Sequence, residues 1–225
     1  MKKHTEPLLP DTYYHVYNRG INGCRIFIKS GNTAFFLQKY AAYIEPIAQT
    51  FAYALMGNHF HFLIKTRSEA EICTYYNTKK TKRDLINEAA NPAYVNKSRA
   101  NKSATYIISA QFGTLFNSYA QAINKQNGRT GGLLEEPFRR IPVDTDNYAA
   151  HLVYYIHHNP VKHGFMEDLT EYPFSSYTVF LDDEPTFIQR DKVFEWFGSK
   201  QAFFDYHGTK HPDNPDWYDE NWVEI

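Results

Sequence analysis

The chain has 225 residues, of which 43% are hydrophobic and 17% aromatic, and its formal net charge is −1. This apolar content is enough for a buried core and excludes a chain that is disordered throughout. The length allows one domain with an extension, or two small domains. No segment approaches the roughly 20 apolar residues of a membrane span.

Two local features indicate the compartment. Residues 1–10 lack the apolar run of a signal peptide. The only cysteines, Cys24 and Cys73, do not have the spacing of metal ligands. We therefore expect reduced thiols and a cytoplasmic protein.

Charge is distributed unevenly along the chain. Residues 181–225 hold 11 acidic and 4 basic residues, whereas residues 1–180 hold 14 acidic and 20 basic residues. A mildly basic body permits contact with nucleic acid, although an ordinary solvated surface explains the same balance. We expect a main domain over residues 1–180 and an acidic C-terminal extension over residues 181–225.

The first part of the chain shows a strand, a helix and a hairpin. Residues 12–18 are rich in aromatic and β-branched side chains, which favours a strand. Residues 33–49 carry apolar side chains at helical spacing. Two strands at 50–56 and 59–65 then flank a Gly-Asn pair, which is a favoured two-residue hairpin turn.

The pattern is interrupted at residues 75–103, where seven basic residues occur against two acidic ones with few large apolar groups. This segment predicts a basic insert that becomes ordered on DNA, or else a solvated helix and loop without a partner. A helix at 106–125 and a short strand at 138–143 follow. A further helix is expected over residues 146–158, because Pro160 follows it.

The order strand, helix, strand, strand, helix, strand matches the split ferredoxin-like arrangement. The fold class is therefore α+β, with an antiparallel sheet that carries two helices on one face. In this arrangement the first and third strands are central. The additional helix at 146–158 carries Tyr155 and can complete a site on the other face.

His59 and His61 are separated by one residue in the predicted strand at 59–65. Residues two apart in a strand point to the same face, so both imidazoles project opposite Phe60 and Phe62, which belong to the core. The rings are then roughly 6–7 Å apart, close enough to bind one metal ion. Since the chain has ten histidines, a chance pair of surface or hydrogen-bonded histidines is the alternative.

A helix that ends at Pro160 places Tyr155 and Asn159 on one face, one turn apart. Tyr154 points about 100° away from Tyr155 and is expected at the surface or facing a partner. With eighteen tyrosines in the chain, Tyr155 alone is also explained as a packing residue. Together, two imidazoles, a carboxamide oxygen and a phenol suggest a metal-assisted tyrosine nucleophile that acts on a phosphodiester.

Four segments resemble the single-tyrosine HUH transposases with the insertion-sequence-200-like domain, and most closely the REP-associated tyrosine transposases. They are residues 14–20 (YHVYNRG), 55–64 (LMGNHFHFLI), 155–164 (YIHHNPVKHG) and 171–177 (EYPFSSY). The resemblance covers residues 12–180. It does not include the acidic extension, and the basic insert is longer than the usual connection of the family.

The resemblance implies a role for each matching residue. His59 and His61 correspond to the metal-binding histidines, Asn159 to the third protein ligand, and Tyr155 to the nucleophile. Members of the family bind single-stranded DNA with hairpins and take part in DNA transposition and recombination. The Asn-Pro version resembles the monomeric branch, so we favour a monomer in which the tyrosine helix serves its own metal site. His15 and His158 are lesser candidates for the metal site.

The chemistry of these groups is consistent with cleavage of a phosphodiester. A phenol has a pKa near 10, so attack requires removal of the Tyr155 proton and relief of charge on the phosphate. Two imidazoles and an amide oxygen suit Mg²⁺ or Mn²⁺, with Zn²⁺ also compatible. Attack leaves a 5′-phosphotyrosine and a free 3′-OH, which permits rejoining. The candidate phosphate contacts, each also explained as a surface cation, are Arg19, Lys65, Arg139 and Arg140.

Three other classes of protein are alternatives. A zinc hydrolase of the metallo-β-lactamase type needs an Asp-His shortly downstream, where Phe62, Leu63 and Ile64 stand. A cupin needs a glutamate about four residues after His61, where Lys65 stands. A non-catalytic, domesticated nucleic-acid-binding relative stays open, although it has no need for Tyr155 and the histidines.

Overall fold

The computed structural model describes residues 5–79, 85–86, 89–91 and 102–210. Most of the basic insert predicted at 75–103 and the last part of the acidic extension lie outside these ranges, so both remain predictions. In chain order the helices and strands are β1 (Tyr13–Arg19), η1 (Ile21–Gly23), α1 (Ser30–Tyr43), β2 (Ala48–Leu55), β3 (His59–Thr66), α2 (Glu69–Thr78), α4 (Ala104–Asn127), β4 (Arg139–Val143), α5 (Asp146–Lys162), η2 (Leu169–Glu171), η3 (Ser176–Phe180), α6 (Arg190–Phe197) and α7 (Lys200–His207).

The strands form one antiparallel sheet in the order β2-β3-β1-β4. The prediction of an α+β ferredoxin-like fold with the first and third strands in the centre is therefore confirmed. The register places Tyr17 of β1 between His61 of β3 and Arg139 of β4. Arg19 pairs with His59. Because directly paired residues share a face of the sheet, these side chains belong to one face.

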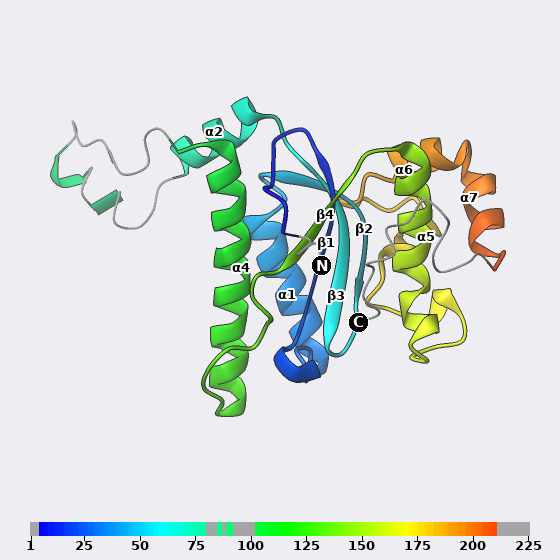
Figure 1. Cartoon of the computed structure of the whole chain (residues 1–225), viewed down its shortest axis with the longest axis horizontal. Helices are drawn as coiled ribbons and strands as arrows, with labels where there is room; N and C mark the ends of the chain where they lie inside the picture. Colours follow the sequence, from blue (N-terminus) through cyan, green and yellow to red (C-terminus); the bar gives the residue numbers. More distant parts are fainter. Residues whose placement is uncertain (1–4, 80–84, 87–88, 92–101, 211–225) are drawn as a thin grey trace.

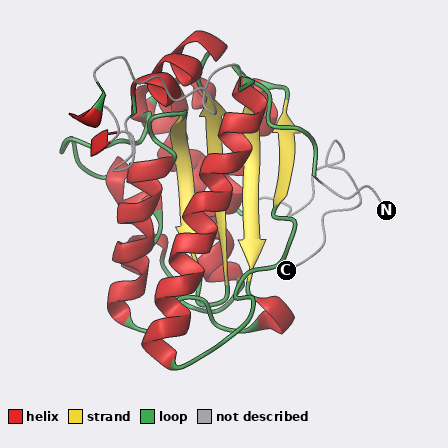
Figure 2. Ribbon diagram, turned by 90° about the vertical axis from the view of Figure 1, so that its left-hand side faces the viewer, coloured by secondary structure: helices red, strands yellow, loops and turns green. Residues whose placement is uncertain are grey.

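Helices cover both faces of the sheet (Figure 1), with α1 and α4 on one side and α5, α6 and α7 on the other. The turned view shows long helices in front of the sheet, running roughly along the strands (Figure 2). On the α1 side, the rings of Phe36 and Phe60 lie 5.2 Å apart, and Tyr40 stacks on Phe62 at 4.3 Å. This apolar layer orients β3 so that His59 and His61 project to the opposite side, toward α5.

Helix α5 differs from its prediction at its C-terminal end. It begins as expected, since the Thr145 side chain accepts a hydrogen bond from the Tyr148 N–H. It does not stop before Pro160 but continues to Lys162. Pro160 lies in the last turns of the helix, where its missing N–H removes only one backbone hydrogen bond. The helix instead ends before Gly164, whose φ of 68° ordinary side chains avoid.

Residues of the predicted acidic extension pack against the domain. Ile188 forms a parallel bridge with Thr50 of β2, and the Gln189 N–H donates to the Thr50 carbonyl at 2.9 Å. Val193 of α6 and Phe203 of α7 are fully buried in the hydrophobic core. At the opposite edge of the sheet, residue Thr5 forms a parallel bridge with Arg140 of β4.

Two further features concern membrane spans and cysteines. None of the helices in the described ranges is long and apolar enough to cross a membrane. Cys24 and Cys73 are free thiols.

Candidate active site

His59 and His61 lie side by side on β3 beneath α5. Their ring centroids are 5.4 Å apart with nearly perpendicular planes. The two residues are only 2% and 1% exposed. The two imidazoles share the face that strand alternation predicts, and α5 covers this face.

The hydrogen bonds of these imidazoles leave one ring nitrogen of each available. The Asn58 carboxamide oxygen lies 2.7 Å from His59 Nδ1. An oxygen acceptor requires a proton on Nδ1, so His59 Nε2 keeps its electron pair. His61 Nδ1 lies 2.9 Å from His15 Nε2, while the buried His61 Nε2 has no hydrogen-bond partner within the described residues.

Asn159 of α5 completes the cluster from the opposite side. Its Oδ1 lies 3.3 Å from His59 Nε2, so two atoms that carry electron pairs face each other. Its Nδ2 is buried and makes no hydrogen bond to any residue the structure describes. Two ligands of one cation, each at about 2.0–2.2 Å, lie roughly 3 Å apart. The spacing of His59 Nε2 and Asn159 Oδ1 therefore suits two ligands of one divalent cation, and His61 Nε2, unbonded in the described part of the chain, is a candidate third ligand.

The composition of this cluster limits the kind of ion. Among the described residues, no group of three or more His, Cys, Asp and Glu side chains is arranged to hold a metal. A site here depends on the Asn159 amide as its third protein ligand. Two nitrogens and one neutral oxygen leave coordination positions for water and phosphate oxygens, as Mg²⁺ and Mn²⁺ require.

Burial keeps both imidazoles neutral. Desolvation lowers the pKa of His59 to about 4, although the Asn159 carboxamide oxygen, which would accept a proton from the charged ring, opposes this shift. Burial, followed by the neighbouring His15, holds the pKa of His61 well below its usual value. Neutral imidazoles are the form in which histidine binds a metal, so no proton needs to be displaced at neutral pH.

Tyr155 projects from α5 toward the same cluster. Its half-buried ring stands edge-on to His61, with centroids 5.6 Å apart and planes at 89°. The His15 ring is 6.4 Å away. The structure therefore brings together the four predicted site residues, His59, His61, Asn159 and Tyr155.

The neighbouring residue Tyr154, expected at the surface or facing a partner, is instead covered by α7 of the same chain. It is 6% exposed, and it stacks on His158 at 4.0 Å beneath α7. The prediction was wrong because nothing in the local pattern indicates that α7 covers this side of α5. His158 faces the same way, since its Nε2 lies 3.0 Å from the His207 carbonyl.

Three aromatic rings near the cluster complete its surroundings. His15, a lesser candidate in the sequence, contacts His61 directly. Tyr17 stacks on His61 at 5.5 Å, and His163 lies 5.0 Å from His59. Sequence reasoning missed Tyr17 and His163. Tyr17 could have been found from strand alternation, because it lies two residues after His15 and therefore points to the same face.

The four predicted phosphate contacts lie in different surroundings. Arg19 and Arg139 flank the cluster, and both are paired with Glu135, at 2.6 and 3.9 Å. Lys65 lies toward the other end of β3, with Nζ 5.4 Å from the Tyr13 ring. Arg140 donates to the Thr5 and Phe138 carbonyls at 2.9 and 3.3 Å, and so holds the N-terminal segment.

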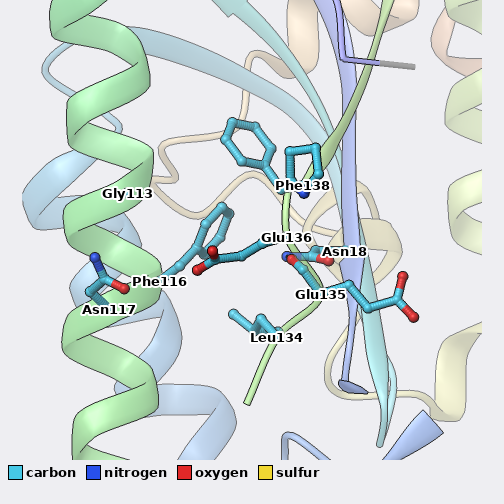
Figure 3. A pocket seen from close by; sticks show the side chains of 9 residues that line it. Asn18, Gly113, Phe116, Asn117, Leu134, Glu135, Glu136 and Phe138 are labelled. Atoms are coloured by element: carbon cyan, nitrogen blue, oxygen red, sulfur yellow. The ribbon is translucent and has the colours of Figure 1, made fainter. Parts of the chain in front are cut away.

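A separate pocket of about 420 Å³ opens between α4 and residues 134–138 (Figure 3). Glu136 reaches into it toward α4, whereas Glu135 points away. Its lining consists of Asn18, Gly113, Phe116, Asn117, Leu134, Glu135, Glu136, Pro137 and Phe138. Since none of the four clustered residues takes part, the pocket does not belong to the candidate active site.

Comparisons with known proteins support the fold. No family model and no curated protein matches the chain. Among solved structures, it is similar to a REP-associated tyrosine transposase bound to a REP hairpin, with a TM-score of 0.52 and 11% identity. The match covers 80% of this chain and 86% of that one. At this identity the likeness shows that the two proteins share a fold.

Proposed function

We propose that this chain is a metal-dependent single-stranded DNA endonuclease of the transposase type. In this proposal it cuts and rejoins DNA at hairpin or palindromic repeat sequences through a 5′-phosphotyrosine on Tyr155. The observation that carries the proposal is the position of the Tyr155 ring, 5.6 Å from His61 and in one cluster with His59 and Asn159. A shared fold with a transposase solved in complex with a hairpin supports it.

The residues of the cluster divide the work in this proposal. Tyr155 loses its phenolic proton, and its oxygen attacks the phosphorus of a DNA phosphodiester. The bond to the 3′ oxygen breaks, and this oxygen leaves as the free 3′-OH after taking up a proton. His59, His61 and Asn159 would hold a divalent ion, Mg²⁺ or Mn²⁺, which would relieve the negative charge on the phosphate.

Arg19 and Arg139 are the stronger of the proposed contacts to the DNA strand. They lie on the face of the cluster, beside His59 and Tyr17 in the register of the sheet. Their side chains are 38% and 34% exposed, and both now pair with Glu135. A DNA phosphate can take the place of this carboxylate, because arginine binds both groups in the same planar geometry. Lys65 and Arg140 stay as weaker proposals.

The proposed function predicts a covalent product. The chain, Mn²⁺ and a labelled single strand with a hairpin should give an adduct that survives denaturation and maps to the α5 peptide by mass spectrometry. The matched duplex without a single-stranded region should give none, because the strand must enter beside Tyr155. Absence of an adduct with every hairpin strand tested would instead favour the non-catalytic nucleic-acid-binding alternative.

We also predict that each chain uses its own tyrosine. In the structure, Tyr155 and His61 of one chain already lie in contact. Mixing equal amounts of His61→Ala and Tyr155→Phe chains should therefore leave cleavage at the level of the two separate variants. Cleavage restored to about a quarter of the wild-type rate or more would show that the tyrosine helix acts on a partner.

A further inference from the structure

Helix α5 takes part in a chain of buried hydrogen bonds that the proposed reaction does not use. His157 Nδ1 lies 3.0 Å from His207 Nε2 of α7, and His157 Nε2 lies 2.9 Å from the Ser176 hydroxyl of η3. All three residues are at most 3% exposed. The chain continues to the sheet, because the Tyr53 N–H of β2 donates to the Ser176 hydroxyl at 2.8 Å.

With one proton on each imidazole, this chain runs in a single direction. The Phe203 carbonyl can only accept, so His207 Nδ1, at 2.8 Å, donates to it. His207 Nε2 must then accept from His157 Nδ1, and His157 Nε2 must accept from the Ser176 hydroxyl. Every donor finds an acceptor, which is the condition for a buried polar network to hold a unique arrangement.

Further contacts join the same helices at both ends of α5. At its start, Trp196 of α6 donates from Nε1 to the Asp146 carboxylate at 3.1 Å. The Trp196 ring also packs on Phe51 of the sheet at 5.0 Å. Near its end, His158 donates from Nε2 to the His207 carbonyl at 3.0 Å. Helices α6 and α7 therefore fix α5 at two separate points.

The residues held by α7 alternate with the residues of the candidate active site. Tyr154 precedes Tyr155, and His157 and His158 precede Asn159. A rotation or shift of α5 that breaks the contacts with α7 must therefore also move Tyr155 and Asn159 away from His61 and His59. A displacement of about 1 Å at a reacting group can cost on the order of 10²-fold in rate.

We propose that residues 188–207, including α6 and α7, act as a clamp that positions α5 over the sheet of the same chain, with His157 and His207 as positioning residues. The role for catalysis rests on the proposed function, whereas the hold on α5 does not. The clamp lies outside the segments that resemble the transposases in sequence. It explains why residues 188–207 of this acidic extension are built into the core and not attached as a separate unit.

A matched pair of substitutions at His207 separates the hydrogen bond from simple packing. His207→Leu fits the surrounding rings of Phe203, Phe197 and Tyr177 but removes the acceptor for His157. His207→Gln keeps an oxygen that can accept this hydrogen bond. Ile72→Ala, a buried residue of α2, serves as a control that lowers stability on the α4 side of the sheet.

The first measurement is amide hydrogen exchange, which needs neither DNA nor metal. In His207→Leu, amides in the second half of α5 should exchange about 10-fold faster or more, while those of α4 stay unchanged. His207→Gln should remain within about 2-fold of wild type. Ile72→Ala should not raise exchange in α5 above that in α4. Equal increases in both helices of His207→Leu, or no increase in α5, would overturn the clamp.

The second measurement is single-turnover cleavage at saturating DNA, at a temperature where all variants are folded. His207→Leu should lower the rate constant by about 10–100-fold without changing half-saturation by DNA, and His207→Gln should restore it. If His207→Leu shows fast amide exchange in α5 but still cleaves DNA at the wild-type rate, the positioning role is rejected. If the wild type itself forms no adduct, the proposed function fails, and hydrogen exchange alone decides whether the clamp exists.

Discussion

Replacing Tyr155 with phenylalanine is expected to abolish the covalent adduct and to reduce strand cleavage on the order of 10⁴-fold or more. The substitution removes only the oxygen that attacks the phosphate. The ring that stands edge-on to His61 remains, so binding of the hairpin strand should change little. Denaturing gel electrophoresis of the labelled strand measures the adduct, and a gel-shift titration measures binding.

Tyr148→Phe is the matched control for this experiment. Tyr148 lies on the same helix, two turns before Tyr155, and is also half-buried. The Tyr148→Phe variant should form the adduct at the wild-type rate. An undiminished adduct in Tyr155→Phe would assign the nucleophile to another residue. Loss of the adduct together with loss of the folded circular dichroism spectrum would show that the ring position itself was disturbed.

The second large effect is expected from His59→Ala, which should lower Mn²⁺-dependent cleavage by about 10²–10³-fold. His59 offers Nε2 at 3.3 Å from Asn159 Oδ1, so its loss removes one of the three proposed ligands. The Mn²⁺ concentration for half-maximal cleavage should rise by more than about 100-fold. Electron paramagnetic resonance of Mn²⁺ without DNA measures the same loss of binding directly.

Because His59 is buried, this variant needs its own measurement of folding. Loss of the hydrogen bond to Asn58 should cost about 0.5–1.5 kcal/mol of the free energy of unfolding. A urea titration with an unchanged slope would show that the chain still folds as one unit. Cleavage by wild type that is equally fast in a chelator would contradict the metal proposal and leave the role of Tyr155 standing.

The parts of this site that the sequence predicted rest on short-range geometry. Alternation along a strand places His59 and His61 together whatever surrounds them. Helical spacing does the same for Tyr155 and Asn159. The prediction that the helix stops before Pro160 was wrong, but Tyr155 and Asn159 still share one helix face. The additional residues extend the helix beyond Asn159 without changing the angle between the two side chains.

The remaining features depend on contacts between distant segments, which spacing does not encode. The burial of His59 and His61 requires α5 to lie on their face, and the burial of Tyr154 requires α7 beyond it. Likewise, no local pattern indicates that the Arg140 guanidinium donates to the Thr5 carbonyl of the N-terminal segment. Local patterns predict which way a side chain points, but not what covers it.

The bridges at the two outer strands have a consequence for the behaviour of the protein in concentrated solution. An uncovered outer strand offers its backbone to another chain and promotes aggregation. Along β2, the Leu55 N–H donates to the Phe174 carbonyl and the Thr50 carbonyl accepts from Gln189. Along β4, the bridge between Thr5 and Arg140 occupies the corresponding position. Both flanks of the sheet are thus protected against pairing with a second molecule by segments of the chain itself.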